Sequence, residues 1–134
     1  MIDHVSIGVR DLAASSAFYA KVLAPLGYSC LVTEPARAGF GTRYPELWLN
    51  ARPDMAAVPD DTGCHVCLRA RTLEAIDAFH GIAVAEGGRD DGPPAVRKAT
   101  MVSYYAAFVR DPDGNRLEAM TVPDVTNIGE KRGS

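Results

Sequence analysis

The chain has 134 residues, of which 47% are hydrophobic and 23% charged, a composition typical of one globular domain. A net charge of −3 offers no basic face for the phosphates of nucleic acid. The apolar runs are far shorter than the roughly 18–20 residues of a membrane span, so we expect neither nucleic acid nor membrane as a partner. The first residues carry no basic segment followed by an apolar one, and we therefore expect an unexported, cytoplasmic protein.

The first half of the chain predicts a strand, a helix and three further strands. Residues 3–10 alternate between apolar and polar side chains, as a half-buried strand does. Asp11 follows as an N-cap, because its short side chain can accept a free N–H of the first helical turn. The helix is expected to run to about Ala24, since Pro25 and Gly27 would end it. The three strands are expected near residues 28–33, 39–42 and 46–50.

The second half repeats this order after a linker over residues 52–62, which holds two prolines and three aspartates. A strand begins near His65, and Thr72 caps a helix that ends at Gly87 and Gly88. Residues 104–110 and 116–121 flank Asp-Pro-Asp-Gly, a strong turn signal, and predict a hairpin. The remaining strand, near residue 89 or 96, is not defined by its pattern. Residues 87–101, rich in glycine and proline, are interpreted as a solvated loop; the alternative is a loop whose Arg89, Arg97 and Lys98 meet an anionic substrate.

The two halves are also similar in sequence. Residues 4–12 align with residues 65–73 without a gap, which places His4 on His65. The other matched pairs are Val5/Val66, Arg10/Arg71, Leu12/Leu73, Ala14/Ala75, Ala17/Ala78, Phe18/Phe79 and Gly27/Gly88. Matches across a strand, a cap, a helix and its closing glycine favour duplication. We predict one domain with module one over about residues 1–51, a linker over 52–62, module two over 63–123 and a polar tail over 124–134.

The three cysteines are interpreted as reduced thiols. An odd number of cysteines in an unexported protein favours this state. Cys64 and Cys67 have the C-x-x-C spacing of a redox pair, but they lie in a strand pattern, where residues three apart point to opposite faces. We therefore expect them to be small buried hydrophobic residues.

Three segments resemble the vicinal oxygen chelate superfamily, which includes glyoxalases, bleomycin-resistance proteins and dioxygenases. They are the strand over residues 3–9 (DHVSIGV), the helix that follows, and residues 108–118 (FVRDPDGNRLE). The D-P-D-G-x-x-x-E ending is typical of the superfamily and of no single reaction. The resemblance implies an α+β fold in which two tandem βαβββ modules form a cupped mixed sheet with the helices on its outer face.

The resemblance also implies a metal site. By position, His4 and His65 would supply ligands from the first strand of each module, and Glu118 from the last strand of module two. Glu46, in the last strand of module one, resembles the ligand glutamate of glyoxalase I. The same strand also resembles that of fosfomycin-resistance thiol transferases, which contributes no fourth ligand, so the role of Glu46 stays open.

Strand alternation supports this placement independently. Each candidate ligand lies opposite apolar neighbours in its strand, as His4 does opposite Val5 and Ile7, so all four would share the cup side of the sheet. Imidazole and carboxylate groups suit a divalent nickel, zinc, iron or manganese ion. The further residues expected in a substrate pocket on that side are Ser6, Trp48, Cys67, Tyr104, Phe108 and Met120.

The favoured function is a metal-dependent enzyme that acts on a small metabolite with vicinal oxygens. Glyoxalase-I-like lyase or isomerase chemistry is expected, with Glu118 and Glu46 as the catalytic carboxylates and the metal as Lewis acid. One alternative is a fosfomycin-type thiol transferase. The other is a metal-free, ligand-sequestering protein of the bleomycin-resistance type. We also expect a homodimer, whose sites could be formed within one chain or by modules of two chains.

Overall fold

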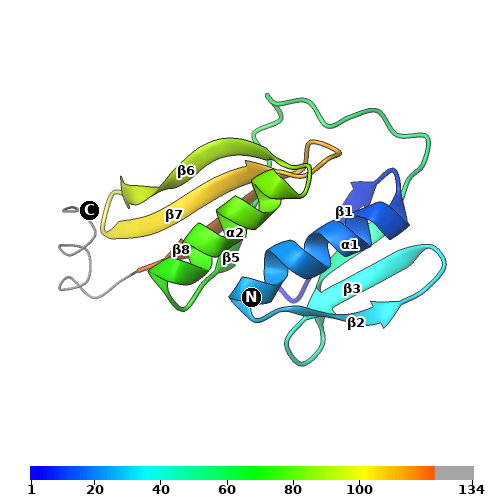
Figure 1. Ribbon diagram of the computed structural model, residues 1–134, viewed down its shortest axis with the longest axis horizontal. Coiled ribbons are helices and arrows are strands. Elements are labelled where there is room, and N and C mark those ends of the chain that lie inside the picture. Colours follow the sequence, from blue (N-terminus) through cyan, green and yellow to red (C-terminus); the bar gives the residue numbers. More distant parts are fainter. Residues whose placement is uncertain (123–134) are drawn as a thin grey trace.

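The computed structural model describes residues 1–122, which form two helices and two four-stranded sheets (Figure 1). Module one contains β1 (Val5–Val9), α1 (Leu12–Leu23), the short 3-10 helix η1 (Ala24–Leu26), β2 (Ser29–Thr33), β3 (Arg37–Gly41) and β4 (Pro45–Ala51). Module two contains β5 (Val66–Arg69), α2 (Leu73–Ala85), β6 (Arg89–Lys98), β7 (Ser103–Arg110) and β8 (Arg116–Thr121). The predicted α+β fold of tandem βαβββ modules is confirmed. The predicted polar tail lies outside the described residues.

The two sheets have the same topology. Their strand orders are β1-β4-β3-β2 and β5-β8-β7-β6, so in each module the first strand lies next to the last. That pair is parallel and the other neighbours are antiparallel. A parallel pair needs a crossover, which the helix of each module provides. The shared topology agrees with the repeat in the sequence.

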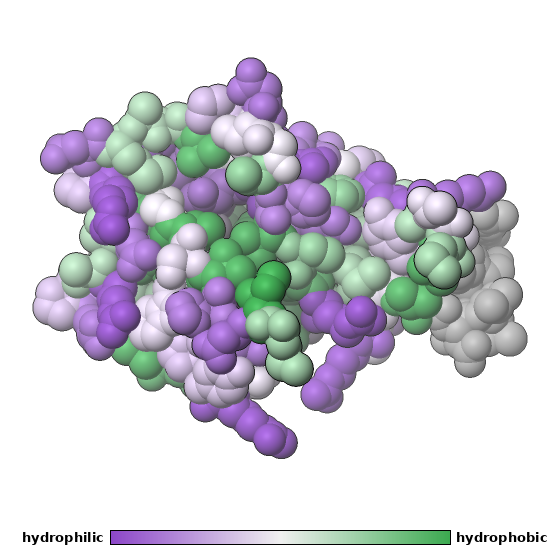
Figure 2. Space-filling view, turned by 180° about the vertical axis from the view of Figure 1, so that it is seen from behind, coloured by the Kyte–Doolittle hydropathy of each residue, from purple (hydrophilic) through white to green (hydrophobic). Residues whose placement is uncertain are grey.

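The hydrophobic core lies between the sheets and the two helices, which run side by side on one face of the molecule (Figure 1). The largest fully buried side chains are Tyr19, Leu23, Phe40, Leu47, Leu49, Ile76, Phe79 and Leu117. Strand alternation leaves the opposite side of each sheet, here called the cup face, free of the helices. From behind, apolar side chains gather in the middle of the molecule and hydrophilic ones surround them (Figure 2).

Both predicted helix caps are confirmed. The Asp11 carboxylate accepts the backbone N–H of Ala14 at 3.0 Å, and the Thr72 hydroxyl accepts that of Ala75 at 3.1 Å. Gly27 has a φ of 84° after the first helix, a left-handed conformation that costs glycine least. No helix within residues 1–122 is long and apolar enough to cross a membrane.

The interpretation of residues 87–101 as a loop is wrong. Most of this segment forms β6, which pairs with β7 and shifts register between Asp90 and Gly92 and again between Gly92 and Ala95. These bulges accommodate Pro93 and Pro94, which cannot donate to a regular ladder. Because β6 is the outermost strand of its sheet, the prolines interrupt no further pairing.

The hairpin turn of module two packs against module one. The Asn115 side-chain amide donates to the Gly8 carbonyl of β1 at 2.9 Å, and the buried Tyr19 hydroxyl of α1 donates to Asp111 at 2.7 Å. The two helices also contact each other. One chain therefore places β1 and β5, the first strands of its two modules, beside shared cavities.

Candidate functional site

A cavity of about 440 Å³ opens where β1 and β4 of module one approach β5 of module two; we call it the seam cavity. Its lining residues are Ile2, Asp3, His4, Val5, Tyr28, Glu46, Leu47, His65, Val66, Cys67 and Leu68. Three of the four predicted metal ligands, His4, Glu46 and His65, therefore face one cavity. All of them come from the same chain.

His65 and Glu118 are in direct contact. The imidazole Nε2 of His65 lies 3.2 Å from Oε1 of Glu118, whose residue is only 6% exposed. The strand register explains the contact: Glu118 of β8 pairs with Cys67 of β5, two residues after His65 and on the same face. The ring of Phe108 meets the His65 ring edge-on, with centroids 5.7 Å apart. In this pair Glu118 is buried, whereas His65 is exposed and lines the seam cavity.

His4 and Glu46 stand apart from this pair. The His4 ring lies on the exposed segment before β1, and its Nδ1 is 2.7 Å from the carboxylate of Asp3. Within residues 1–122, no three histidine, cysteine or acidic side chains lie close enough together to hold a metal ion. The structure thus brings His65 and Glu118 into contact. It places His4 and Glu46 at the seam cavity, which His65 also lines.

Tyr28 is a cavity residue that the sequence did not single out. Burial first, and then the charge of Glu46, raise the pKa of Tyr28 to about 12. A neutral tyrosine hydroxyl therefore stands beside the Glu46 carboxylate. Tyr28 directly precedes β2, where its position alone could not distinguish a cavity residue from a core residue.

The three cysteines are free thiols, as expected, but they are exposed and not buried. Burial was the wrong expectation for Cys67, because β5 is the edge strand of its sheet and borders the seam cavity. Desolvation, and then the charge of Glu118, raise the pKa of Cys67 to about 12. At neutral pH Cys67 is a protonated thiol, which is a poor nucleophile.

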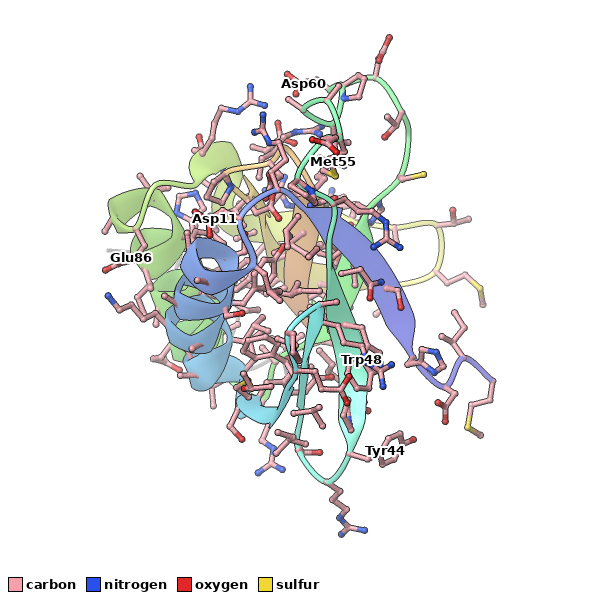
Figure 3. The ribbon with its side chains drawn as sticks, turned by 90° about the vertical axis from the view of Figure 1, so that its right-hand side faces the viewer. Asp11, Tyr44, Trp48, Met55, Asp60 and Glu86 are labelled. Carbon is pink, nitrogen blue, oxygen red and sulfur yellow. The ribbon has the colours of Figure 1, made fainter. Side chains whose placement is uncertain are left out.

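The other predicted pocket residues, in module one and module two, belong to four cross-strand pairs. Ser6 pairs with Trp48, which points away from the helices (Figure 3) and lies under the guanidinium of Arg37, 4.3 Å from its ring centre. In module two, Phe108 pairs with Glu118 and shares its face. Met120 of β8 pairs with Ala106 of β7. Tyr104 of β7 pairs with Arg97 of β6.

Comparisons with known proteins agree with this architecture. The family model described as Glyoxalase/Bleomycin resistance protein/Dioxygenase superfamily matches residues 1–119. A glyoxalase/bleomycin resistance protein from Albidiferax ferrireducens T118 is 30% identical, with a TM-score of 0.78 over 88% of this chain and 96% of that one. The chain therefore belongs to the glyoxalase/bleomycin resistance protein/dioxygenase superfamily.

More distant structures share the fold. A glyoxalase/bleomycin resistance protein/dioxygenase family enzyme from Burkholderia phytofirmans PsJN is 23% identical, with a TM-score of 0.68 over 91% of this chain and 98% of that one. A family protein from Alicyclobacillus acidocaldarius is 19% identical, with a TM-score of 0.65 over 96% and 95% of the two chains. The comparison with curated proteins finds no match.

Proposed function

We propose that the protein is a divalent-metal-dependent enzyme that acts on a small metabolite with vicinal oxygens, by glyoxalase-I-like lyase or isomerase chemistry. The contact between His65 and Glu118 carries this proposal. Two ligand atoms that each lie about 2.0–2.2 Å from one metal, at about 90–110°, are roughly 2.8–3.6 Å apart. The observed 3.2 Å between Nε2 and Oε1 falls in this interval.

The remaining donors support a metal site at the seam cavity. His4 and Glu46 line the same cavity as His65, so they could complete a set of two imidazoles and two carboxylates. His4 would have to exchange its contact with Asp3 for the metal. A bound cation would supply Lewis-acid polarisation of two neighbouring substrate oxygens.

Individual side chains of the protein would contribute to the reaction in different ways. Glu46 is the proposed base that removes a proton from a substrate carbon and returns it, because its carboxylate lies at the cavity wall beside the neutral Tyr28 hydroxyl. Glu118 is buried against His65 and fixes the orientation of that ring. Apolar lining residues, including Leu47, Val66 and Leu68, would exclude water from the reacting atoms.

Metal titration of chelator-treated protein tests the proposal. We expect one nickel, zinc, manganese or ferrous ion per chain, measured by calorimetry and elemental analysis. His65→Ala and Glu118→Gln should each weaken binding by about 100-fold or more, since each removes a ligand. His80→Gln is the matched control, because His80 contacts Asp90 and does not line the seam cavity. Failure of the wild-type chain to bind any of these ions would contradict the proposal.

A metal-free binding protein of the bleomycin-resistance type is the second candidate. The separation of His4 from the His65–Glu118 pair favours it, as does the lack of a three-donor cluster within residues 1–122. The two functions differ in whether ligand binding and turnover depend on a metal ion. A sequestering protein would retain a small organic ligand after chelator treatment and would show no turnover with any added metal.

We include a homodimer in the proposed function. Large apolar side chains are exposed near the N-terminus and between β6 and β7, with Ile2 82% and Met101 95% accessible to solvent. A second copy that covered them would remove this apolar surface from water. The seam cavity is lined by one chain, so the proposed dimer does not require the two chains to exchange modules.

A further inference from the structure

The cup face of module two carries a cationic cluster around one aromatic ring. Phe108 of β7 lies between two neighbouring strands, β6 and β8. The guanidinium carbon of Arg116 is 4.1 Å from the centre of the Phe108 ring, and that of Arg97 is 5.1 Å from it. Guanidinium groups stacked on a ring keep their in-plane N–H groups available for acceptors. We call Arg97, Phe108 and Arg116 the arginine–phenylalanine cluster.

Arg97 has no carboxylate partner in the described part of the chain. Its Nη2 donates to the Pro93 carbonyl at 2.8 Å, whereas its buried Nε has no hydrogen-bond partner. The pKa of the Asp90 carboxyl is lowered mainly by His80 and least by the charge of Arg97. That carboxylate already accepts the Gly92 N–H and contacts His80. A partly buried guanidinium without a counterion is costly, and an anion would offset that cost.

The backbone holds Arg97 in this position. The residue lies beyond the second bulge of β6, and its side chain extends back over Gly92. A Cβ at Gly92 would lie 3.0 Å from Arg97 Nη2 and 3.1 Å from the Phe108 ring, so a side chain there would press on both. The bulge and its glycine therefore make room for the guanidinium on the ring.

Charge on this face is only partly compensated. The Asp91 carboxylate oxygen accepts from Arg116 Nε at 2.6 Å and from Arg110 Nε at 3.1 Å, so one carboxylate serves two guanidinium groups. Asp60 lies 3.7 Å from the same Arg110 Nε but is also paired with Arg89 at 2.7 Å, and Glu118 is in contact with His65. The structure gives the terminal nitrogens of Arg116 and Nη1 of Arg97 no acceptor within residues 1–122.

The cluster adjoins the candidate site. Arg116 and His65 line the same second cavity, of about 100 Å³, and Phe108 contacts the His65 ring. We propose that Arg97 and Arg116 bind an anionic group of the substrate, a carboxylate or a phosphate, on the Phe108 ring. Resting on the proposed function, this inference also assigns the substrate class: an anionic metabolite whose vicinal oxygens face His65 and Glu118.

Anion titration of the full-length, metal-free protein tests the inference without relying on catalysis. The probes are inorganic phosphate and benzoate, added at constant ionic strength, and the readout is the NMR signals of the arginine Nε–H groups. We expect the Arg97 and Arg116 signals to shift with saturation. Arg97→Gln should raise the dissociation constant about tenfold, as expected for the loss of one charge-assisted hydrogen bond.

Arg37→Gln is the matched control, because Arg37 also lies over an aromatic ring, that of Trp48, but is paired with Glu34 at 2.7 Å. It should leave the dissociation constant unchanged. Arg97→Lys keeps the charge without the planar fork and replaces Arg97→Gln if the latter fails to fold. Tighter binding of benzoate than of phosphate would assign a carboxylate, and the reverse a phosphate.

The inference is overturned if neither probe shifts these signals, or if the Arg97 and Arg37 variants bind the anion equally well. Metal titration of the same samples separates the two proposals. Anion binding without metal binding would leave the cluster intact and remove the metal-dependent function. Metal binding without anion binding would overturn the inference about the cluster and leave the metal-dependent function standing.

Discussion

Arg10, which follows β1, and Asp113, in the turn between β7 and β8, join the two modules although they are 103 residues apart in the sequence. One carboxylate oxygen of Asp113 accepts both the backbone N–H of Arg10, at 3.1 Å, and its guanidinium Nε, at 2.8 Å. The second oxygen accepts the Ser15 hydroxyl at 3.4 Å. The buried carboxylate therefore fixes the hairpin of module two to the start of α1.

Removing this acceptor should destabilise the fold. We expect Asp113→Ala to lower the free energy of unfolding by about 2–4 kcal/mol, because it leaves the Arg10 N–H and the Ser15 hydroxyl without their partner. Urea denaturation measures the change. Asp54→Ala, an exposed aspartate in the linker, should stay within about 0.5 kcal/mol of wild type. Equal midpoints for the two variants would contradict the role of Asp113.

The same turn depends on a glycine. Gly114 has a φ of 95°, and a Cβ there would lie 2.6 Å from the carbonyl oxygen of Val58. Gly114→Val should therefore destabilise by more than about 1 kcal/mol in thermal or urea unfolding. Gly81→Ala is the opposite case, since Gly81 lies inside α2 with no atom near its Cβ position, and should stabilise by up to about 1 kcal/mol. An unchanged midpoint for the Gly114 variant would be evidence against the strain.

Stability should also vary with pH through Asp111. Burial raises the pKa of this carboxyl above its ordinary value of 3.8, against hydrogen bonds from Tyr19 and Asn115 that lower it. The folded chain thus keeps this proton to higher pH than the unfolded chain. The contribution of Asp111 is most favourable below the unfolded pKa and falls as the pH rises through the folded pKa.

Asp111→Asn isolates that contribution. The unfolding free energy of wild type minus that of the variant should decrease from about pH 4 upward and become constant above the folded pKa. Urea denaturation at a series of pH values between about 4 and 7 measures this difference. A difference that rises with pH would show that the hydrogen bonds outweigh burial at Asp111.

Metal binding should survive dissociation of the proposed dimer. The cavity residues His4, Glu46 and His65 all come from one chain, so dilution should separate the chains without releasing the ion. Light scattering across a concentration series, with metal content measured in parallel, tests this expectation. Loss of metal in step with loss of the dimer would instead indicate modules exchanged between chains.

Local sequence signals predicted most of the fold. Alternation located β1, and the side-chain oxygens of Asp11 and Thr72 marked the starts of both helices. A strand was expected near residue 89 or 96, but the sequence did not define β6, because glycine and proline signal a loop, whereas a bulged edge strand accepts both. Its pairing with β7 depends on two register shifts, which no local pattern shows.

The candidate site was only partly predictable for similar reasons. The resemblance to the superfamily assigned His65 and Glu118 to the first and last strands of module two, and in the structure these two side chains are in contact. The orientation of His4 depends on its neighbour Asp3, and the approach of Tyr28 to Glu46 depends on how β2 begins. The arginine–phenylalanine cluster joins three strands across a bulge, so it could not be inferred before the register was known.

The bulged strand β6 has a consequence for solubility. As the outermost strand of its sheet, it would normally offer a row of free N–H and C=O groups to another chain. Pro93 and Pro94 lack N–H groups, and the register shifts around Gly92 break the regular spacing of the others. That edge is therefore a poor template for an incoming strand, which protects the module-two sheet from edge-to-edge aggregation.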